Sequence, residues 1–374
     1  MAKAKGERFA FLDVVRGLAV IWMIQVHVTN VVLDPSLRIG WIFDVLNISN
    51  GFVAPTFIFC AGAGLWIALS RKGESYRTFG SDLFGYLRRL GYILVWAYSL
   101  HAPFYSLDRV LIATGEELLP WLQIDVLQTI VFSSLAALGI YLGFGDLRKA
   151  TWAYGIVAAA IICGTWATGF WPRESPFPLL PWSGYLFAGA FVTGLFMQAE
   201  DKGRIARWMF WIGFIGPFMI FLSKNIGPAM PWDESWWRSS PGMHLFRICG
   251  TLMLLGLLYT QEQRMRTSKL GTLLQTIGNE SLFMYVGHLL FVYGSMQSVI
   301  ASIYGSSTLG YGGVAVAWII VTVVFVGFMM IWHSLKTKRP VLAQRIIIIQ
   351  LAWMVISFIV LPADFSFSRL LGLD

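Results

Sequence analysis

Long apolar runs separated by short charged stretches dominate this chain of 374 residues. A run of about 17–25 apolar residues is long enough to cross a bilayer as an α-helix. Eleven such runs occur, at 9–33, 48–70, 86–107, 124–143, 151–170, 182–198, 208–223, 244–260, 281–300, 314–334 and 341–361. No internal repeat, low-complexity tract or soluble segment separates them. The pattern predicts an all-α polytopic membrane protein with about eleven transmembrane helices in a single domain over residues 1–374.

Composition supports a membrane protein and narrows the chemistry. Hydrophobic residues make up 57% of the chain and charged residues 13%, whereas soluble proteins carry roughly 25% charged residues. Cys60, Cys163 and Cys249 lie in apolar runs without metal-ligand spacing, so we interpret them as core residues and expect no metal site. The sequence lacks a glycine-rich phosphate loop, which argues against nucleotide-hydrolysing and dinucleotide-binding enzymes.

Lysine and arginine are unevenly divided between the two sets of loops. The connections on one side and the C-terminal tail hold six, which are Arg38, Arg109, Arg173, Lys224, Arg238 and Arg369. The N-terminus and the remaining connections hold eighteen. Because cytoplasmic loops carry the excess of Lys and Arg, the N-terminus is predicted to be cytoplasmic and the C-terminus external.

The same asymmetry accounts for the net charge of +8, so no nucleic-acid partner is expected. The predicted location is the cell membrane, of the bacterial inner-membrane type, where the protein crosses the lipid bilayer many times.

The first apolar run carries two residues that are costly inside a membrane. Arg16 and His27 are eleven residues apart, which places them on one helix face about 16 Å apart along the axis. Asp13 lies one turn before Arg16 and can form an ion pair with it. Charged and titratable residues within spans usually pair or serve a function, so this face indicates a polar path across the membrane.

Further polar residues are predicted at two depths of the membrane. Asn30, Asp44, Asn50, His101, Asp125, Gln128, His244 and Arg247 fall near the outer side, and Arg88, Arg89, Asn279, Glu280, Tyr285 and His288 near the inner side.

Packing is the competing interpretation of these polar residues. A lone histidine such as His101, His244 or His333 is more often a satisfied packing residue than a catalyst. Asn50 and Gln128 can join helices by hydrogen bonds. The Arg88–Arg89 pair is also typical of a cytoplasmic helix end.

Five segments of the chain resemble transmembrane acyltransferases. RFAFLDVVRGLAVIWMIQVHV, at 8–28, resembles their first helix, whose signature is Arg, ten residues and then His. NGFVAPTFIFCAGAGLWIAL, at 50–69, resembles their second helix. DVLQTI at 125–130, FPLLPWSGYLFAGAFVTGL at 177–195 and IGNESLFMYVGHLLF at 277–291 resemble one branch, the heparan-α-glucosaminide N-acetyltransferase-like proteins. The core motifs span residues 8–300, and two C-terminal helices follow at 314–361.

The resemblance implies transfer of an acyl group, commonly acetyl, from cytoplasmic acyl-CoA to a sugar or glycan on the far side of the membrane. It implies that His27 is the catalytic residue and Arg16 its motif partner. Branch members often have Asn at the position of His27 and a histidine in the following loop, whereas the loop 34–45 contains none here. The resemblance also implies an acidic residue before the proline of the second helix, but this chain has Gly51 at that position. Either His27 serves as in the wider superfamily, or catalysis is absent.

Acyl transfer from a thioester needs a base, a site for the donor and a site for the acceptor, and the candidate residues can be matched to these roles. His27 can act as general base or accept the acyl group itself, and the sequence does not separate these routes. Arginines suit the phosphates of CoA, and polar groups at the outer side suit sugar hydroxyls. The predicted donor-side residues are Arg16, Arg88, Arg89, Tyr285 and His288, the acceptor-side residues are Asn50, His101, Asp125 and Gln128, and Asp13 and Asn279 are supporting.

Two other functional classes remain open. A membrane transporter would also place polar residues in its spans, although the sequence has no inverted repeats or paired broken helices. An inactive membrane scaffold would keep the fold without the chemistry. A homodimer is one assembly that the sequence leaves open.

Overall fold

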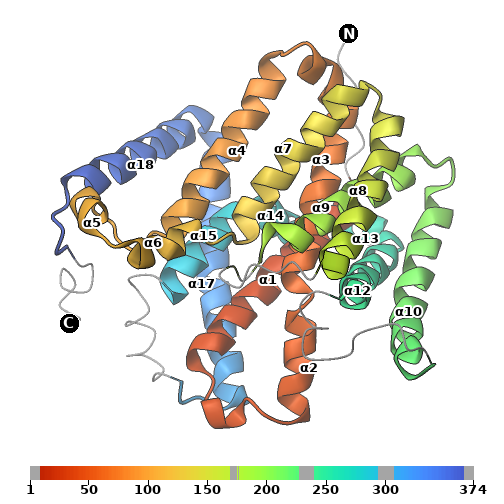
Figure 1. Ribbon diagram of the computed structural model, residues 1–374, viewed down its shortest axis with the longest axis horizontal. Coiled ribbons are helices and arrows are strands. Elements are labelled where there is room, and N and C mark those ends of the chain that lie inside the picture. Colours follow the sequence, from red (N-terminus) through yellow and green to blue (C-terminus); the bar gives the residue numbers. More distant parts are fainter. Residues whose placement is uncertain (1–8, 169–174, 176, 227–239, 294–306, 366–374) are drawn as a thin grey trace. The chain divides into compact units, whose positions relative to one another are not determined.

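The computed structural model describes residues 9–168, 175, 177–226, 240–293 and 307–365. These residues form helices, joined by turns and by one isolated β-bridge between Leu33 and Leu309. The all-α prediction is therefore confirmed for this part of the chain (Figure 1). Several of the loop arginines and lysines that predict the orientation lie outside the described residues, among them Arg173, Arg238 and Arg369.

Each of the eleven predicted runs overlaps a helix. These helices are α1 (Ala10–Val32), α3 (Val53–Arg77), α4 (Ser81–Leu100), α7 (Val126–Phe144), α8 (Leu147–Thr168), α9 (Leu179–Gln198), α10 (Lys202–Ile226), α12 (Pro241–Tyr259), α15 (Ser281–Val292), α17 (Tyr311–Lys338) and α18 (Pro340–Val360). The shorter helices between them are η1 (Pro35–Leu37), α2 (Trp41–Asn50), α5 (Leu107–Ile112), α6 (Gly115–Leu122), α13 (Glu262–Thr267) and α14 (Lys269–Asn279).

Eight helical segments of the described chain are long and apolar enough to cross a membrane. They comprise α1, the segment Trp41–Arg77 with α2 and α3, α7, α8, α9, α12, α17 and α18. Helices α4 and α10 are not in this set, and α15 is a shorter apolar helix of 12 residues. The protein is thus a multi-pass membrane protein, and the number eleven stays a prediction.

The exposed side chains of the C-terminal helices fit a lipid environment. Val323 and Ile331 of α17 and Ile349 and Trp353 of α18 are between 65% and 70% exposed. Apolar surface of this kind is rare on soluble monomers but normal where lipid chains cover a helix. In the most apolar 18-residue stretch of α18, only 6% is buried inside the protein.

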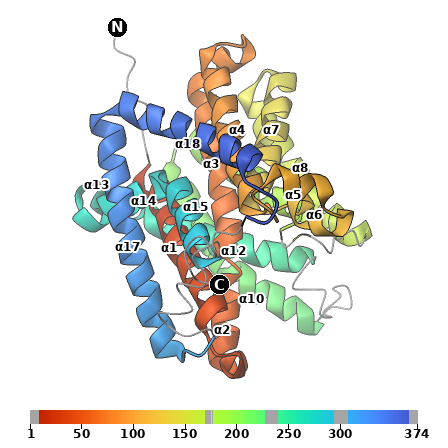
Figure 2. The same ribbon diagram turned by 90° about the vertical axis from the view of Figure 1, so that its left-hand side faces the viewer.

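Helices begin and end where local chemistry requires it. The first amides of α1, those of Ala10 and Phe11, donate to the two carboxylate oxygens of Glu262, each at 2.8 Å. An anion suits this position because the first amides of a helix have no intrahelical acceptor. Between α17 and α18 the chain turns at Arg339 (φ −136°, ψ 64°), the residue before Pro340, and Figure 2 shows the bend. A residue that precedes proline avoids the helical conformation.

The described chain forms two compact units, each built from three separate segments. The first unit comprises residues 1–19, 48–95 and 124–279, and the second comprises 20–47, 96–123 and 280–374. In the first unit α9 packs against α3 and α8, and α10 packs against α12. In the second unit α17 packs against α15 and α18. Organisation of the whole chain as one domain stays a prediction.

Glycines allow a close contact between two helices of the first unit. A Cβ atom on Gly62 of α3 would lie 1.9 Å from the carbonyl oxygen of Leu186, and one on Gly189 of α9 would lie 2.0 Å from that of Phe59. Any larger residue would overlap the facing backbone, so α3 and α9 touch main chain to main chain. Small residues at such contacts are typical of helix packing in membranes.

Candidate active site

Two glycines bring the start of α1 against α14 in the first unit. A Cβ on Gly17 would lie 2.2 Å from the carbonyl oxygen of Leu274, and a Cβ on Gly278 would lie 2.1 Å from that of Asp13. The two backbones therefore approach as closely as those of α3 and α9. This contact places Arg16 beside the C-terminal end of α14.

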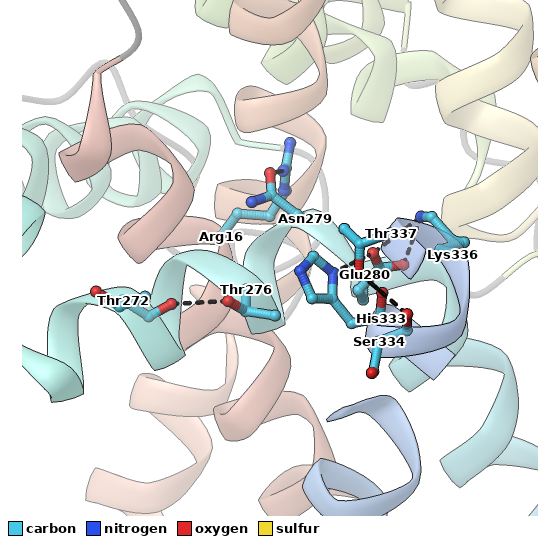
Figure 3. Close-up of polar contacts among 9 residues, drawn as sticks. All are labelled: Arg16, Thr272, Thr276, Asn279, Glu280, His333, Ser334, Lys336 and Thr337. Atoms are coloured by element: carbon cyan, nitrogen blue, oxygen red, sulfur yellow. Dashed lines mark hydrogen bonds and ion pairs between the residues drawn. The ribbon is translucent and has the colours of Figure 1, made fainter. Parts of the chain in front are cut away.

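Arg16 is surrounded by oxygen acceptors at this contact. Its Nη2 atom lies 3.0 Å from Asp13 Oδ1 and 3.3 Å from Asn279 Oδ1, and its Nε atom donates to the carbonyl oxygen of Gly278. Figure 3 shows Arg16 and Asn279 side by side. The predicted Asp13–Arg16 ion pair is confirmed, and Asn279 joins the same cluster. The arginine side chain is 22% exposed, so the cluster forms a largely enclosed, charge-compensated anchor.

His27 and His288 meet in the second unit. His27 Nδ1 lies 2.8 Å from His288 Nε2, and the two rings are inclined by only 12° with centroids 5.0 Å apart. Face-to-face stacked rings cannot bring their nitrogens that close, so the rings lie edge to edge and share an N–H···N hydrogen bond. The contact joins the predicted catalytic residue to one of the predicted donor-side residues.

Neighbouring groups hold this histidine pair. His288 is fully buried, and its Nδ1 lies 2.6 Å from the carbonyl oxygen of Met284, one turn earlier in α15. The ring of Tyr285 meets His288 edge to face at a centroid distance of 6.1 Å. Tyr293 places its ring edge to face against His27 at 5.3 Å, and its hydroxyl oxygen lies 3.4 Å from Asn30 Nδ2.

The other predicted acceptor-side residues have different surroundings. Asp125 is the N-cap of α7: its side chain accepts from the amide of Val126 at 2.6 Å, and Gln128 Oε1 accepts from the amide of Asp125 at 3.2 Å. The Asp125 side chain also accepts from the amide of Gln128, and this reciprocal pair of bonds is a capping box that gives both side chains a structural role. Asn50 ends α2 in the first unit, and His101 follows α4 in the second; both are half-buried.

Arg88 and Arg89 lie on an exposed part of α4. Among the described residues, no hydrogen bond or ion pair joins either of them to Arg16. Their cationic groups are thus presented to the surroundings of the helix, whereas that of Arg16 is enclosed.

A second buried histidine lies in the first unit. Tyr185 and His244 are both buried, and the tyrosine hydroxyl lies 2.5 Å from His244 Nδ1. The guanidinium group of Arg247 lies over the ring of Trp182 at 5.4 Å. Trp182 and Tyr185 belong to the segment 177–195 singled out in the sequence, although the sequence did not indicate that they contact residues of α12.

Glu280 joins α15 to α17 through an ion-pair cluster in the second unit. Its carboxylate is 5% exposed and accepts from Lys336 Nζ at 2.9 and 2.8 Å, and His333 Nδ1 lies 2.9 Å away (Figure 3). His333 is thus a satisfied packing histidine. No group of three or more His, Cys, Asp or Glu residues able to hold a metal occurs in the described parts of the chain.

A sequence model of one family matches a large part of the chain. The match is to heparan-alpha-glucosaminide N-acetyltransferase, catalytic region, over residues 8–226, which is more than half of the 374 residues. The chain belongs to this family.

Heparan-alpha-glucosaminide N-acetyltransferases use acetyl-CoA as donor, so at the level of the family this chain is a membrane acetyltransferase. The matched stretch includes Arg16 and His27 but ends before α12, α14 and α15, which carry His244, Asn279 and His288. No curated protein sequence matches the chain.

Proposed function

We propose that this protein transfers the acetyl group of cytoplasmic acetyl-CoA to a hydroxyl or amine of a sugar or glycan on the extracytoplasmic side of the cell membrane. The observation that carries the proposal is the placement of His27. It lies within the family match, in an apolar helix, and one ring nitrogen is fixed by a hydrogen bond to His288. A fixed imidazole is suited to abstract or carry a proton beside a reacting group.

The chemistry requires a base and a leaving group. The O–H or N–H proton of the acceptor passes to a ring nitrogen of His27 while the acceptor atom bonds to the thioester carbonyl carbon. The C–S bond then breaks, and the departing thiolate takes the proton from His27 to give the CoA thiol. In a second route the ring nitrogen itself bonds to the acetyl carbon while the C–S bond breaks, and CoA leaves as its thiolate. The acceptor atom then bonds to the acetyl carbon while the C–N bond breaks, the freed ring nitrogen takes the acceptor proton, and the proton passes through water to the thiolate.

Donor binding is assigned to the cytoplasmic end of the molecule. Arg88 and Arg89 are exposed on α4 and suit the phosphates of CoA, because guanidinium groups donate pairs of hydrogen bonds to phosphate oxygens. The positive charge of Arg16 would also attract the phosphates of CoA, but its contacts with Asp13 and Asn279 support a role in joining α1 to α14 as well. Along α1 an extended pantetheine arm would run about 16 Å from the level of Arg16 to that of His27.

Acceptor contacts are assigned to the outer polar residues that do not cap a helix. Asn50 and His101 are half-buried and carry groups that donate or accept hydrogen bonds. Asp125 and Gln128 instead hold the first turn of α7, and we expect their substitution to act on that helix before it acts on the acceptor.

Sidedness follows from the charge distribution, and reporter fusions test it. A reporter placed within 71–80 is expected on the cytoplasmic side, and one placed within 223–243 on the outside, because the N-terminus is assigned to the cytoplasm. Two reporters on the same side would contradict the arrangement.

The decisive activity experiment measures release of CoA thiol by the purified protein in lipid nanodiscs. With acetyl-CoA and glucosamine we expect acceptor-dependent release that His27→Ala abolishes and His333→Gln, a substitution outside the proposed site, leaves unchanged. Release that is independent of both acceptor and His27 would contradict the proposal. Absence of release combined with uptake of a sugar by proteoliposomes would favour a transporter.

A further inference from the structure

The hydrogen bonds from Met284 through His288 to His27 have only one consistent direction. A carbonyl oxygen can only accept, so the 2.6 Å contact between Met284 O and His288 Nδ1 requires a proton on Nδ1. His288 is fully buried, and no carboxylate contacts it among the described residues. A buried unpaired charge is costly, so His288 is neutral and its Nε2 carries no proton.

The direction of the next bond follows from this assignment. A bare Nε2 can only accept, so the 2.8 Å contact requires His27 Nδ1 to donate. The proton of the neutral His27 ring is thereby placed on Nδ1, and its Nε2 keeps a free lone pair. Among the described residues, no hydrogen bond engages His27 Nε2, and the side chain of His27 is only partly buried.

We propose that His288 is a positioning residue that holds His27 as the Nδ1–H tautomer, so that Nε2 of His27 is the atom that meets the reacting groups. This inference rests on the proposed acetyl transfer for its kinetic consequence but not for the tautomer itself. It applies to both routes, because the same lone pair would abstract the acceptor proton or bond to the acetyl carbon.

The hydrogen bond between His27 and His288 also stabilises His27 when its ring becomes charged during the reaction. When Nε2 takes the acceptor proton, His27 becomes an imidazolium, and its Nδ1–H still donates to His288 Nε2. A hydrogen bond from a charged donor is about twice as strong as a neutral one. The proton then leaves from Nε2 to the thiolate of CoA, so both histidines return to their starting state.

Tyr293 restrains the orientation of the His27 ring from another side. Its ring meets that of His27 at an angle of 71°. The substitution Tyr293→Phe would keep this aromatic edge and remove only the contact with Asn30.

Two substitutions of His288 separate a positioning role from a packing role. His288→Phe keeps a planar ring and removes the acceptor, whereas His288→Gln keeps a carbonyl acceptor at the end of the side chain. We expect His288→Phe to lower kcat on the order of 10- to 100-fold, the size of the loss when a metal-bound imidazole loses its outer hydrogen-bond partner. KM for acetyl-CoA should change little, and His288→Gln should recover part of kcat. His333→Gln, a substitution outside the histidine pair, should behave nearly as wild type.

Nitrogen NMR of histidine-labelled protein tests the tautomer without any activity measurement. The chain has only five histidines, and His27→Asn identifies the resonances of His27. We expect a protonated Nδ1 and a bare Nε2 on His27 in the wild type, and loss of this preference in His288→Phe. A wild-type His27 protonated on Nε2 would overturn the inference.

Equal kcat in His288→Phe and His333→Gln would also overturn the inference. If His288→Phe fails to fold, the wild-type spectrum and the His288→Gln variant decide the question alone. If the wild type shows the Nδ1–H tautomer but transfers no acetyl group, the proposed function fails and the tautomer assignment stands.

Discussion

Arg16 and His27 share one face of α1, yet their surroundings differ in kind. The guanidinium group of Arg16 is enclosed by acceptors from Asp13, Gly278 and Asn279. His27 has one ring nitrogen bonded to a neutral imidazole, and no described residue bonds to the other. A saturated charge stabilises the packing around it, whereas a half-bonded neutral ring keeps a lone pair for chemistry. Within one helix, the difference separates an anchor from the group that we propose to be reactive.

The largest expected effect comes from removing the imidazole ring of His27, the proposed catalytic group. We expect His27→Ala and His27→Asn to fold and to bind CoA, but to lose about 100- to 10,000-fold in transfer rate, the contribution of a general base. The loss of transfer rate would be greater if His27 also carries the acetyl group. Steady-state transfer kinetics together with CoA titration measure both quantities. Near-normal transfer by His27→Asn would make His27 a packing residue and would move the base to His101 or His288.

Donor affinity is expected to depend on the exposed arginines of α4. Loss of a charge-assisted hydrogen bond costs about 1.5–3 kcal/mol, so Arg88→Ala or Arg89→Ala should raise the Kd for CoA about 10- to 100-fold. Arg345→Ala, which removes an exposed arginine from α18, is the control. Calorimetric or fluorescence titration in nanodiscs measures the change. Binding equal to that of Arg345→Ala in both variants would refute the site.

Substitutions near Arg16 that disturb the packing of α1 against α14 are expected to lower the stability of the protein. Gly17→Ala would place a methyl group 2.2 Å from the carbonyl oxygen of Leu274, and overpacking of this kind costs about 1–3 kcal/mol. Gly64→Ala is the matched control, because no atom beyond its chain neighbours and its own helix backbone lies within 4 Å of its Cβ position. It should be neutral or slightly stabilising. Unfolding of the two variants compares them directly. Equal stability would mean that α1 and α14 are not in contact.

The smallest expected effect is that of Arg16→Lys. Lysine keeps the charge beside Asp13 but loses the bond to the Gly278 carbonyl, which should lower stability by about 0.5–1.5 kcal/mol. The Kd for CoA should stay within about threefold of wild type, a change below 1 kcal/mol. A large loss of CoA affinity with unchanged stability would instead make Arg16 a direct donor contact.

Local patterns in the sequence predicted the helices and the nearest contacts. The apolar runs predicted where helices lie, and the i, i+3 spacing predicted the Asp13–Arg16 pair. The Asp-x-x-Gln pattern at 125–128, just before an apolar run, carried a readable capping signal. The acceptor contact expected of these two side chains stays a prediction.

Contacts between distant segments could not be predicted in the same way. His27 and His288 are 261 positions apart, and both were candidates, but no periodicity shows that they share a hydrogen bond. The contact of Arg16 with Gly278 depends on two glycines in different helices. The carboxylate at the start of α1 comes from Glu262, more than 250 positions away.

The most direct test places donor and acceptor on opposite sides of a membrane. Proteoliposomes of known orientation would be given acetyl-CoA on the side of the N-terminus and glucosamine on the other side, and acetylated sugar would be measured by mass spectrometry. We predict product with the wild type and none with His27→Asn. Product formed equally by the two proteins, or only when donor and acceptor share a side, would contradict the account.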